Sequence, residues 1–194
     1  QLALSQYKQA IPFVQNDTSA SSREILAHTY NNIAFAFEKI GATDSSALYF
    51  MKALAIRKKL NKQDKIGQSL AYLGQLATQM HRYQLAEKYL DDAIALNSKT
   101  GNSLYLAYAW MYKGDNALKQ KNYTAALSHF RRSKQILLTN DLNTHIVKLA
   151  LRTGNALLES NRLKEAAEEG NQAYAQAVKF SQSTEKREAL RLLS

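Results

Sequence analysis

The sequence predicts an all-α protein, a right-handed α-solenoid in which antiparallel helix pairs stack on one another. The first observation is composition: the 194 residues include one proline and seven glycines. A β protein needs more of both for its tight turns, whereas strong helix formers such as Ala, Leu, Lys, Gln and Glu are abundant. The second observation is an internal repeat of forty residues.

Small residues recur in three columns when the chain is aligned with itself at this spacing. The columns are Ala34, Gly74, Gly114 and Gly154; Ser46, Ala86, Ala126 and Ala166; and Ala53, Ala93, Ser133 and Ala173. Phe50, Leu90 and Phe130 stand between the second and third columns, and Gly170 breaks the pattern in the fourth row. Small side chains let two helix backbones approach, and a bulky neighbour fills the space beside them. Each repeat is therefore expected to be a pair of antiparallel helices.

The repeats are expected to make residues 1–194 a single array. Full repeats are expected at 21–61, 64–98, 103–139 and 142–181, with a partial repeat at 1–15 and the start of a further helix at 184–194. The helices within them are expected at 21–40, 44–61, 64–80, 83–98, 103–120, 123–139, 142–160 and 162–181. Since both ends interrupt a repeat, we expect a longer parent protein and a last helix with an open apolar face suited to a homodimer.

Local signals support the helix starts in chain order. Residues 21–24 (Ser-Ser-Arg-Glu) are typical of a capping box for the first helix, and Gly41 precedes the second helix, near Asp44. The residues Asn140 and Asp141 precede the last full repeat. The remaining helices are placed by the columns of small residues.

The repeats resemble the tetratricopeptide repeat signature. The residues that carry the resemblance are Leu73, Gly74, Tyr83, Ala86 and Ala93 in one repeat, and Trp110, Gly114, Tyr123, Ala126 and Phe130 in the next. The usual period is about 34 residues, so the longer period implies helices extended by roughly one turn. The sequence departs from the signature at Lys113 and Thr153, where leucine is usual, and at Ala77, Ala117 and Leu157, where tyrosine is usual.

The resemblance implies a non-catalytic module that binds a protein or peptide. Forty-residue arrays are similar to the amino-terminal regions of bacterial sensor histidine kinases and transcription regulators, and to eukaryotic scaffold and motor light-chain repeats. The resemblance therefore also implies that the chain is the signal-transduction input (sensor domain) or the scaffold part of a larger protein.

A concave groove lined by the first helix of each repeat is also implied by the resemblance. By column, its lining residues are Asn31, Phe35, Tyr72, Gln75, Tyr108, Met111, Tyr112, Asp115, Lys148, Arg152 and Asn155. The tyrosines at 72, 108 and 112, with Met111, are expected to grip an extended or helical peptide; plain packing between helices is the alternative for the tyrosines.

A clamp for the carboxyl-terminal tails of chaperones is not expected. Lys148 and Arg152 match its last two positions, but Ala71, Gln75 and Tyr112 stand where the clamp has lysine, asparagine and asparagine. Lys148 and Arg152, four residues apart on one helix, are still expected to hold a single carboxylate.

No catalytic residue, metal or cofactor is expected. The four histidines show no metal-ligand spacing such as HExxH, and glycine-rich phosphate loops are absent. The acidic pairs 91–92 and 168–169 diverge by about 100° along a helix and cannot face one reacting atom. The absence of cysteine fits both a reducing cytoplasm and a bacterial periplasm.

The net charge of +10 favours acidic partners. Basic clusters occur at Arg57, Lys58, Lys59, Lys62 and Lys65, and at Arg131, Arg132 and Lys134. Solvated helix faces are the favoured interpretation. The alternative is a basic, nucleic-acid-associated solenoid, which requires Lys58, Lys59, Arg131 and Arg132 to form one stripe. No apolar run approaches the roughly 20 residues that span a bilayer, so membrane insertion is not expected.

Overall fold

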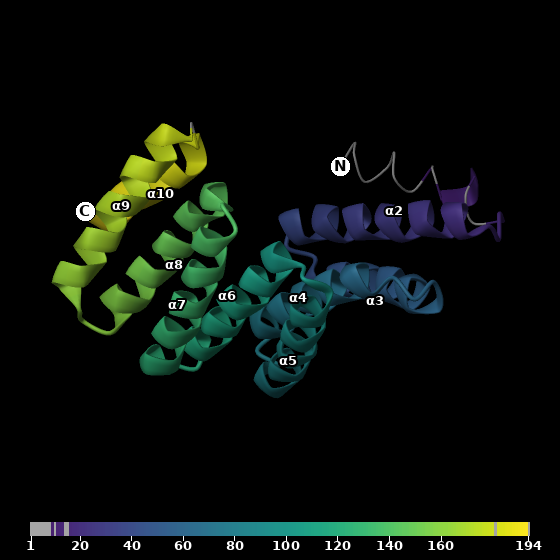
Figure 1. Cartoon of the computed structure of the whole chain (residues 1–194), viewed down its shortest axis with the longest axis horizontal. Helices are drawn as coiled ribbons and strands as arrows, with labels where there is room; N and C mark the ends of the chain where they lie inside the picture. The colour runs from purple at the N-terminus through teal and green to yellow at the C-terminus, as the bar shows by residue number, and fades with distance from the viewer. Residues whose placement is uncertain (1–8, 10, 14–15, 181, 194) are drawn as a thin grey trace. The chain divides into compact units, whose positions relative to one another are not determined.

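The computed structural model describes residues 9, 11–13, 16–180 and 182–193, and no strand occurs among them. The chain folds as an all-α solenoid of helix hairpins, which confirms the predicted fold class, and it divides into two compact units, Gln1–Gly101 and Asn102–Ser194 (Figure 1). Most of the partial repeat expected at 1–15 lies outside the described residues. In the described part of the chain, no helix is long and apolar enough to span a membrane.

The described residues of the first unit form four long helices. They are α2 (Ala20–Lys39), α3 (Thr43–Lys59), α4 (Gln63–Gln79) and α5 (Tyr83–Thr100). Each helix packs against the next one along the chain, and α2 with α3 and α4 with α5 form the two hairpins (Figure 1). Their bounds agree with the expected ranges to within two residues.

In the second unit, the residues that the structure describes form two hairpins followed by a further helix. Its elements are α6 (Ser103–Lys119), α7 (Tyr123–Thr139), the 3-10 turn η1 (Asn143–His145), α8 (Ile146–Glu159), α9 (Leu163–Lys179) and α10 (Ser183–Leu193). The expected helix at 142–160 begins late, because Asn143–His145 form a 3-10 turn before α8. Helix α10 packs against both α8 and α9.

A left-handed residue ends the helices at a spacing of twenty residues. These residues are Gly41, Asn61, His81, Gly101, Lys121, Asp141 and Asn161. The amide that follows bonds back to a carbonyl five residues earlier, as from Lys62 to Arg57 (3.0 Å) and from Arg82 to Ala77 (2.8 Å). This bond satisfies a carbonyl at the helix end and reverses the chain. Two such helix-and-turn segments make up the forty-residue repeat.

Two of the expected helix starts need correction. The capping box at 21–24 is wrong, because α2 begins at Ala20 and the hydroxyl of Ser19 accepts the Ser22 amide (3.2 Å). Asn140 and Asp141 do precede the last full repeat, but they end α7 and do not cap the next helix: Asn140 is the C-cap of α7, and Asp141 is left-handed with φ of 55°. Local cap chemistry suits several nearby positions equally, and the packing of the helix selects among them.

The columns of small residues lie at helix crossings, as the sequence predicted. Ala34 and every member of the second and third columns are completely buried. A Cβ atom on Gly74 would lie 2.5 Å from Cγ of Leu90, and one on Gly114 would collide with the Phe130 ring. In the α4–α5 and α6–α7 hairpins, the bulky residue therefore packs directly on the small residue of the partner helix.

The fourth row keeps this arrangement with a residue from another helix. Gly170 stands where a bulky residue is expected, and Leu192 of α10 packs over Gly154 instead. A Cβ atom on Gly170 would lie 3.3 Å from Cδ2 of the same leucine and 3.0 Å from Cδ2 of Leu193. Glycine at 170 thus makes room for α10 between the last two helices of the final hairpin.

Candidate peptide-binding site

In the first unit, Phe35 of α2 and Tyr72 of α4 belong to one aromatic cluster. The Phe35 ring meets the Tyr72 ring edge-on at 4.8 Å, and Tyr72 stacks on Phe50 of α3 at 5.3 Å between ring centroids. Phe50 is completely buried, whereas Phe35 and Tyr72 are half-buried. The cluster therefore holds three helices together and keeps part of two rings at the surface.

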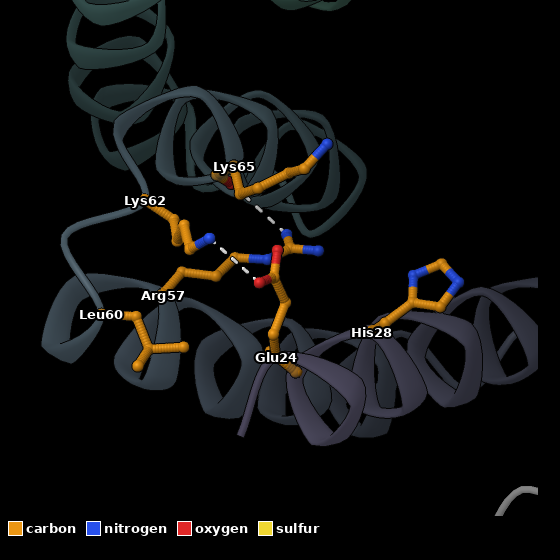
Figure 2. A pocket seen from close by; sticks show the side chains of 7 residues that line it. Glu24, His28, Arg57, Leu60, Lys62 and Lys65 are labelled. Carbon is orange, nitrogen blue, oxygen red and sulfur yellow. Dashed lines mark hydrogen bonds and ion pairs between the residues drawn. The ribbon is translucent and has the colours of Figure 1, made fainter. Parts of the chain in front are cut away.

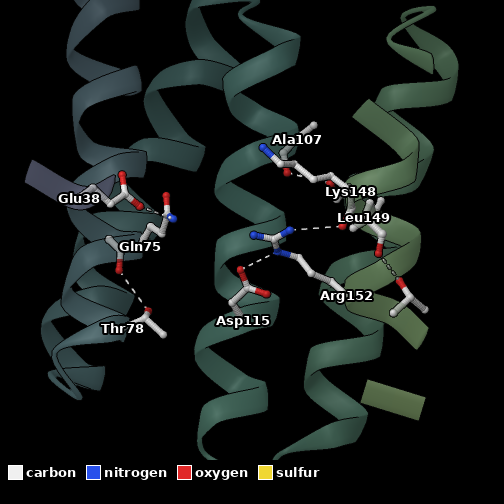
Figure 3. A network of polar contacts seen from close by, with 11 residues as sticks. Glu38, Gln75, Thr78, Ala107, Asp115, Lys148, Leu149 and Arg152 are labelled. Atoms are coloured by element: carbon white, nitrogen blue, oxygen red, sulfur yellow. Dashed lines mark hydrogen bonds and ion pairs between the residues drawn. The ribbon is translucent and has the colours of Figure 1, made fainter. Parts of the chain in front are cut away.

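Polar contacts fix the other two residues expected in this unit. The Gln75 amide nitrogen donates to Oε1 of Glu38 at 3.1 Å, which links α4 to α2 (Figure 3). Asn31 is buried, and its Oδ1 accepts from Nη1 of Arg57 at 3.4 Å. Asn31 therefore belongs to the core of the first unit.

In the second unit, three tyrosines follow one face of α6. Tyr105, Tyr108 and Tyr112 are three and four residues apart, and successive ring centroids are 5.9 Å apart. Tyr112 is buried, whereas Tyr105 and Tyr108 are half-buried. Met111, also expected in the groove, is 1% exposed and belongs to the core. The outer part of this face is thus formed by two phenol rings.

His145, at the end of η1, completes the face. Its Nδ1 lies 2.8 Å from the Tyr108 hydroxyl, and its ring meets the Tyr108 ring edge-on at 5.5 Å. Burial lowers the pKa of His145, and Lys148 lowers it further. Burial also raises the pKa of the Tyr108 hydroxyl, with a smaller contribution from Tyr105. Both side chains are therefore neutral near pH 7, and they share one hydrogen bond whose donor depends on the imidazole tautomer.

An ion pair borders the tyrosine face. Nε of Arg152 on α8 lies 2.9 Å from Oδ2 of Asp115 on α6, and Nη1 of Arg152 donates to the Lys148 carbonyl at 3.2 Å (Figure 3). Burial raises the pKa of Asp115, although Arg152 acts in the opposite direction. Arg152 thus already meets one carboxylate of this chain, Asp115, with which a carboxylate of a partner would compete.

The last residue expected in the groove, Asn155, lies on α8. Asn155 is exposed and lines a pocket of about 220 Å³ with Glu188 of α10. Among the described residues, no three His, Asp or Glu side chains are grouped so that they could hold a metal ion.

Sequence reasoning did not find Tyr105 or His145. Tyr105 had a detectable signal, since tyrosines at i, i+3 and i+7 share one helix face. His145 had none, because it lies in a 3-10 turn that the forty-residue alignment does not predict.

The neutral imidazole makes the stability of the second unit depend on pH. Because the folded pKa of His145 is lowered, its contribution is complete above the ordinary histidine pKa and is lost as the pH falls below about 6.5. The free energy of unfolding should therefore start to fall at this pH. The fall should be smaller in His145→Gln, whose amide can still form a hydrogen bond with Tyr108. Urea unfolding of both proteins between pH 7.5 and pH 5, followed by Trp110 fluorescence, measures the difference. If the free energy of unfolding changed equally with pH in the two proteins, His145 would not be the group responsible.

Antiparallel helix hairpins with small residues at each crossing define a helical-repeat protein. Tetratricopeptide repeat models match residues 26–64 and 73–137, which together are more than half of the chain. The chain belongs to the tetratricopeptide repeat family, and this membership supports a protein-interaction module.

Solved structures with the same fold come from several proteins. A Rap protein complexed with Competence and Sporulation Factor has a TM-score of 0.84 and 17% identity, over 95% of this chain and 51% of that one. The Rap conjugation gene regulator of plasmid pLS20, in complex with the Phr* peptide, has a TM-score of 0.82 and 19% identity, over 96% and 51%. A putative kinesin light chain from Podosopora anserina, described as having nearly identical TPR-like repeats, has a TM-score of 0.61 and 16% identity, over 91% and 95%.

The chain spans about half the length of the two Rap structures. At these identities the likeness concerns the fold. A comparison with curated proteins finds no match.

Proposed function

We propose that this chain is a non-catalytic module that binds a peptide segment of a protein partner through the face formed by Tyr105, Tyr108 and His145. The observation that carries the proposal is the fixed, half-buried arrangement of these rings. Aromatic rings with polar edges bind peptides through apolar contact and hydrogen bonds at a small entropic cost. The hydrogen bond between Tyr108 and His145 fixes both rings before any ligand arrives.

In the first unit, Phe35, Tyr72 and Gln75 are proposed as a second contact surface. In the second unit, Lys148, Asp115 and Arg152 are proposed as polar contacts beside the tyrosines, and Asn155 as a further polar contact on α8. Their partial exposure supports this assignment. The Asp115–Arg152 pair offers an acceptor and donors that a peptide backbone can approach.

We further propose that the module is the input or scaffold part of a signalling protein. Both Rap structures are complexes, one with Competence and Sporulation Factor and one with the Phr* peptide. Because one fold carries many functions, this proposed role depends on peptide binding by the face formed by Tyr105, Tyr108 and His145.

Self-association through α10 is proposed as a second mode of interaction. Leu190 and Leu193 are 49% and 37% exposed on this helix. Exposed leucines on one helix favour a helix-to-helix contact between copies. Light scattering over a range of protein concentrations tests this mode, and a monomer mass at every concentration would exclude it.

The peptide-binding proposal is tested with peptides selected from a random displayed library on the purified chain. Tyr108→Ala should weaken binding of the selected peptides by about tenfold, or about 1.4 kcal/mol, because it removes a ring and its hydroxyl. Tyr89→Ala, which removes a half-buried tyrosine from the second helix α5, is the control and should leave binding unchanged. Fluorescence anisotropy gives the dissociation constants, and far-UV circular dichroism checks the fold. Equal effects of both substitutions would exclude the tyrosine face.

A further inference from the structure

A basic pocket lies within the first unit where α2, α3 and α4 meet. It has a volume of about 130 Å³, and its charged lining residues are Glu24, Arg57, Lys62 and Lys65, with His28 beside them (Figure 2). Glu24 and His28 come from the start of α2, Arg57 from the last turn of α3, and Lys65 from the first turn of α4. Three cations and one carboxylate therefore line the pocket.

Arg57 forms the fixed part of the pocket. Its side chain is 5% exposed, which corrects the expectation that the whole basic cluster lies on a solvated helix face. Nη1 donates to the Ser69 hydroxyl at 2.6 Å and to the Asn31 amide oxygen and the Lys65 carbonyl, both at 3.4 Å. A guanidinium keeps its proton at any physiological pH, so these neutral acceptors hold a permanent positive charge in place.

The two lysines form an adjustable rim. Nζ of Lys62 lies 3.0 Å from Oε2 of Glu24, and Nζ of Lys65 lies 3.5 Å from Oδ2 of Asp64. All four side chains are close to half exposed, between 44% and 49%. Exposed ion pairs of this kind contribute only about 0–1 kcal/mol, so both lysines can exchange their carboxylate partners.

The start of α4 adds to the attraction for anions. The helix begins at Gln63, and its N-cap, Lys62, makes no side-chain cap bond. The amides of a first helical turn carry a partial positive charge and favour an anion placed near them. The first turn of α4 carries Lys65, which lines the pocket, and also the carboxylate of Asp64.

We infer that this pocket binds a carboxylate of an acidic peptide segment, and that Glu24 is an internal carboxylate that competes for it. Glu24, Arg57 and Lys62 point toward one another, so the pocket already receives a carboxylate of this chain (Figure 2). An acidic side chain of a partner would take the place of Glu24 on Lys62, while Glu24 turns to solvent. The inference names a partner chemistry for the proposed binding module. The pocket lies in the first unit and the tyrosine face in the second, so separate substitutions show which of the two binding proposals fails.

The test uses a fluorescein-labelled hexaglutamate peptide and the full 194-residue chain at low salt. Lys62→Gln combined with Lys65→Gln should weaken binding about tenfold, as expected when two charged contacts are lost. Lys58→Gln combined with Lys59→Gln is the matched control, since it removes the same charge from exposed lysines at the end of α3. The control should weaken binding less than threefold, through the smaller net charge alone.

Glu24→Gln separates a binding pocket from a merely structural ion pair. It should tighten hexaglutamate binding severalfold, because the internal competitor is removed and the rim lysines stay in place. Arg57 is kept intact, because its hydrogen bonds join three helices. Equal weakening in the pocket variant and its control, or unchanged affinity in Glu24→Gln, would overturn the inference. Displacement of the peptide by inorganic phosphate at lower concentration than by glutarate would overturn the assignment to a carboxylate.

Discussion

Gly114→Val should lower the free energy of unfolding of the second unit by about 3 kcal/mol, because an overfilled core forces side chains or backbone to move. A Cβ atom at this position already collides with the Phe130 ring, and valine adds two methyl groups to it. The ring cannot turn into solvent, since Phe130 is 1% exposed. Helices α6 and α7 would therefore have to separate at their crossing.

Trp110, the only tryptophan in the chain, lies on α6 and reports this transition in urea. Lys119→Val, which places the same residue at the exposed end of α6, is the control and should change the free energy by about 0.5 kcal/mol or less.

A double-mutant cycle assigns the loss to the named contact. Phe130→Ala alone should cost about 3–5 kcal/mol through the cavity that it leaves. In the double variant the valine enters that cavity, so the combined loss should fall short of the sum of the single losses by more than about 1 kcal/mol. Additive losses would show that the two positions are not in contact, and the explanation of the repeat columns would fail with them.

Leu192→Ala should release α10 from the second unit. Leu192 is 9% exposed and packs on Gly154 of α8 and Gly170 of α9. Truncating a buried leucine removes about 3 kcal/mol, so amides of residues 183–193 should exchange about 100-fold faster. Hydrogen exchange with mass spectrometry measures this for α10 against the rest of the unit.

Leu190→Ala, compared at a protein concentration where light scattering gives a monomer mass, makes the same substitution on the same helix at a side chain that is 49% exposed. Because little apolar surface is lost there, exchange in α10 should change less than threefold. Equal acceleration by both variants would mean that helix propensity, and not the contact with the two glycines, holds α10 in place.

The candidate site was predictable only in part. The resemblance placed Tyr108, Tyr72 and Phe35 on first helices, and all three keep exposed surface. It also placed Asn31 and Met111 among the groove residues, and both are buried. A repeat column specifies a helix face to about one residue, whereas exposure depends on how far the neighbouring helix overlaps that face.

The exposure of the charged residues was even less predictable from the sequence. Arg57 and Lys58 are adjacent in a basic run, yet Arg57 is buried among polar groups of α2 and α4 and Lys58 is exposed. Sequence spacing could not tell which of them points inward. Likewise, Lys148 and Arg152 were predicted as a pair, but Asp115, 37 residues before Arg152, is the partner that Arg152 takes.

The sequence by itself determined the helices, their pairing and the small residues at their crossings. These features follow from local propensity and from a repeat whose period is fixed by one helix and one turn. Tertiary structure alone decided that Leu192 replaces the residue missing at Gly170, that His145 bonds Tyr108, and that Arg57 enters a pocket. Each depends on the direction in which a side chain leaves its helix and on what lies opposite, and contacts between distant segments determine both.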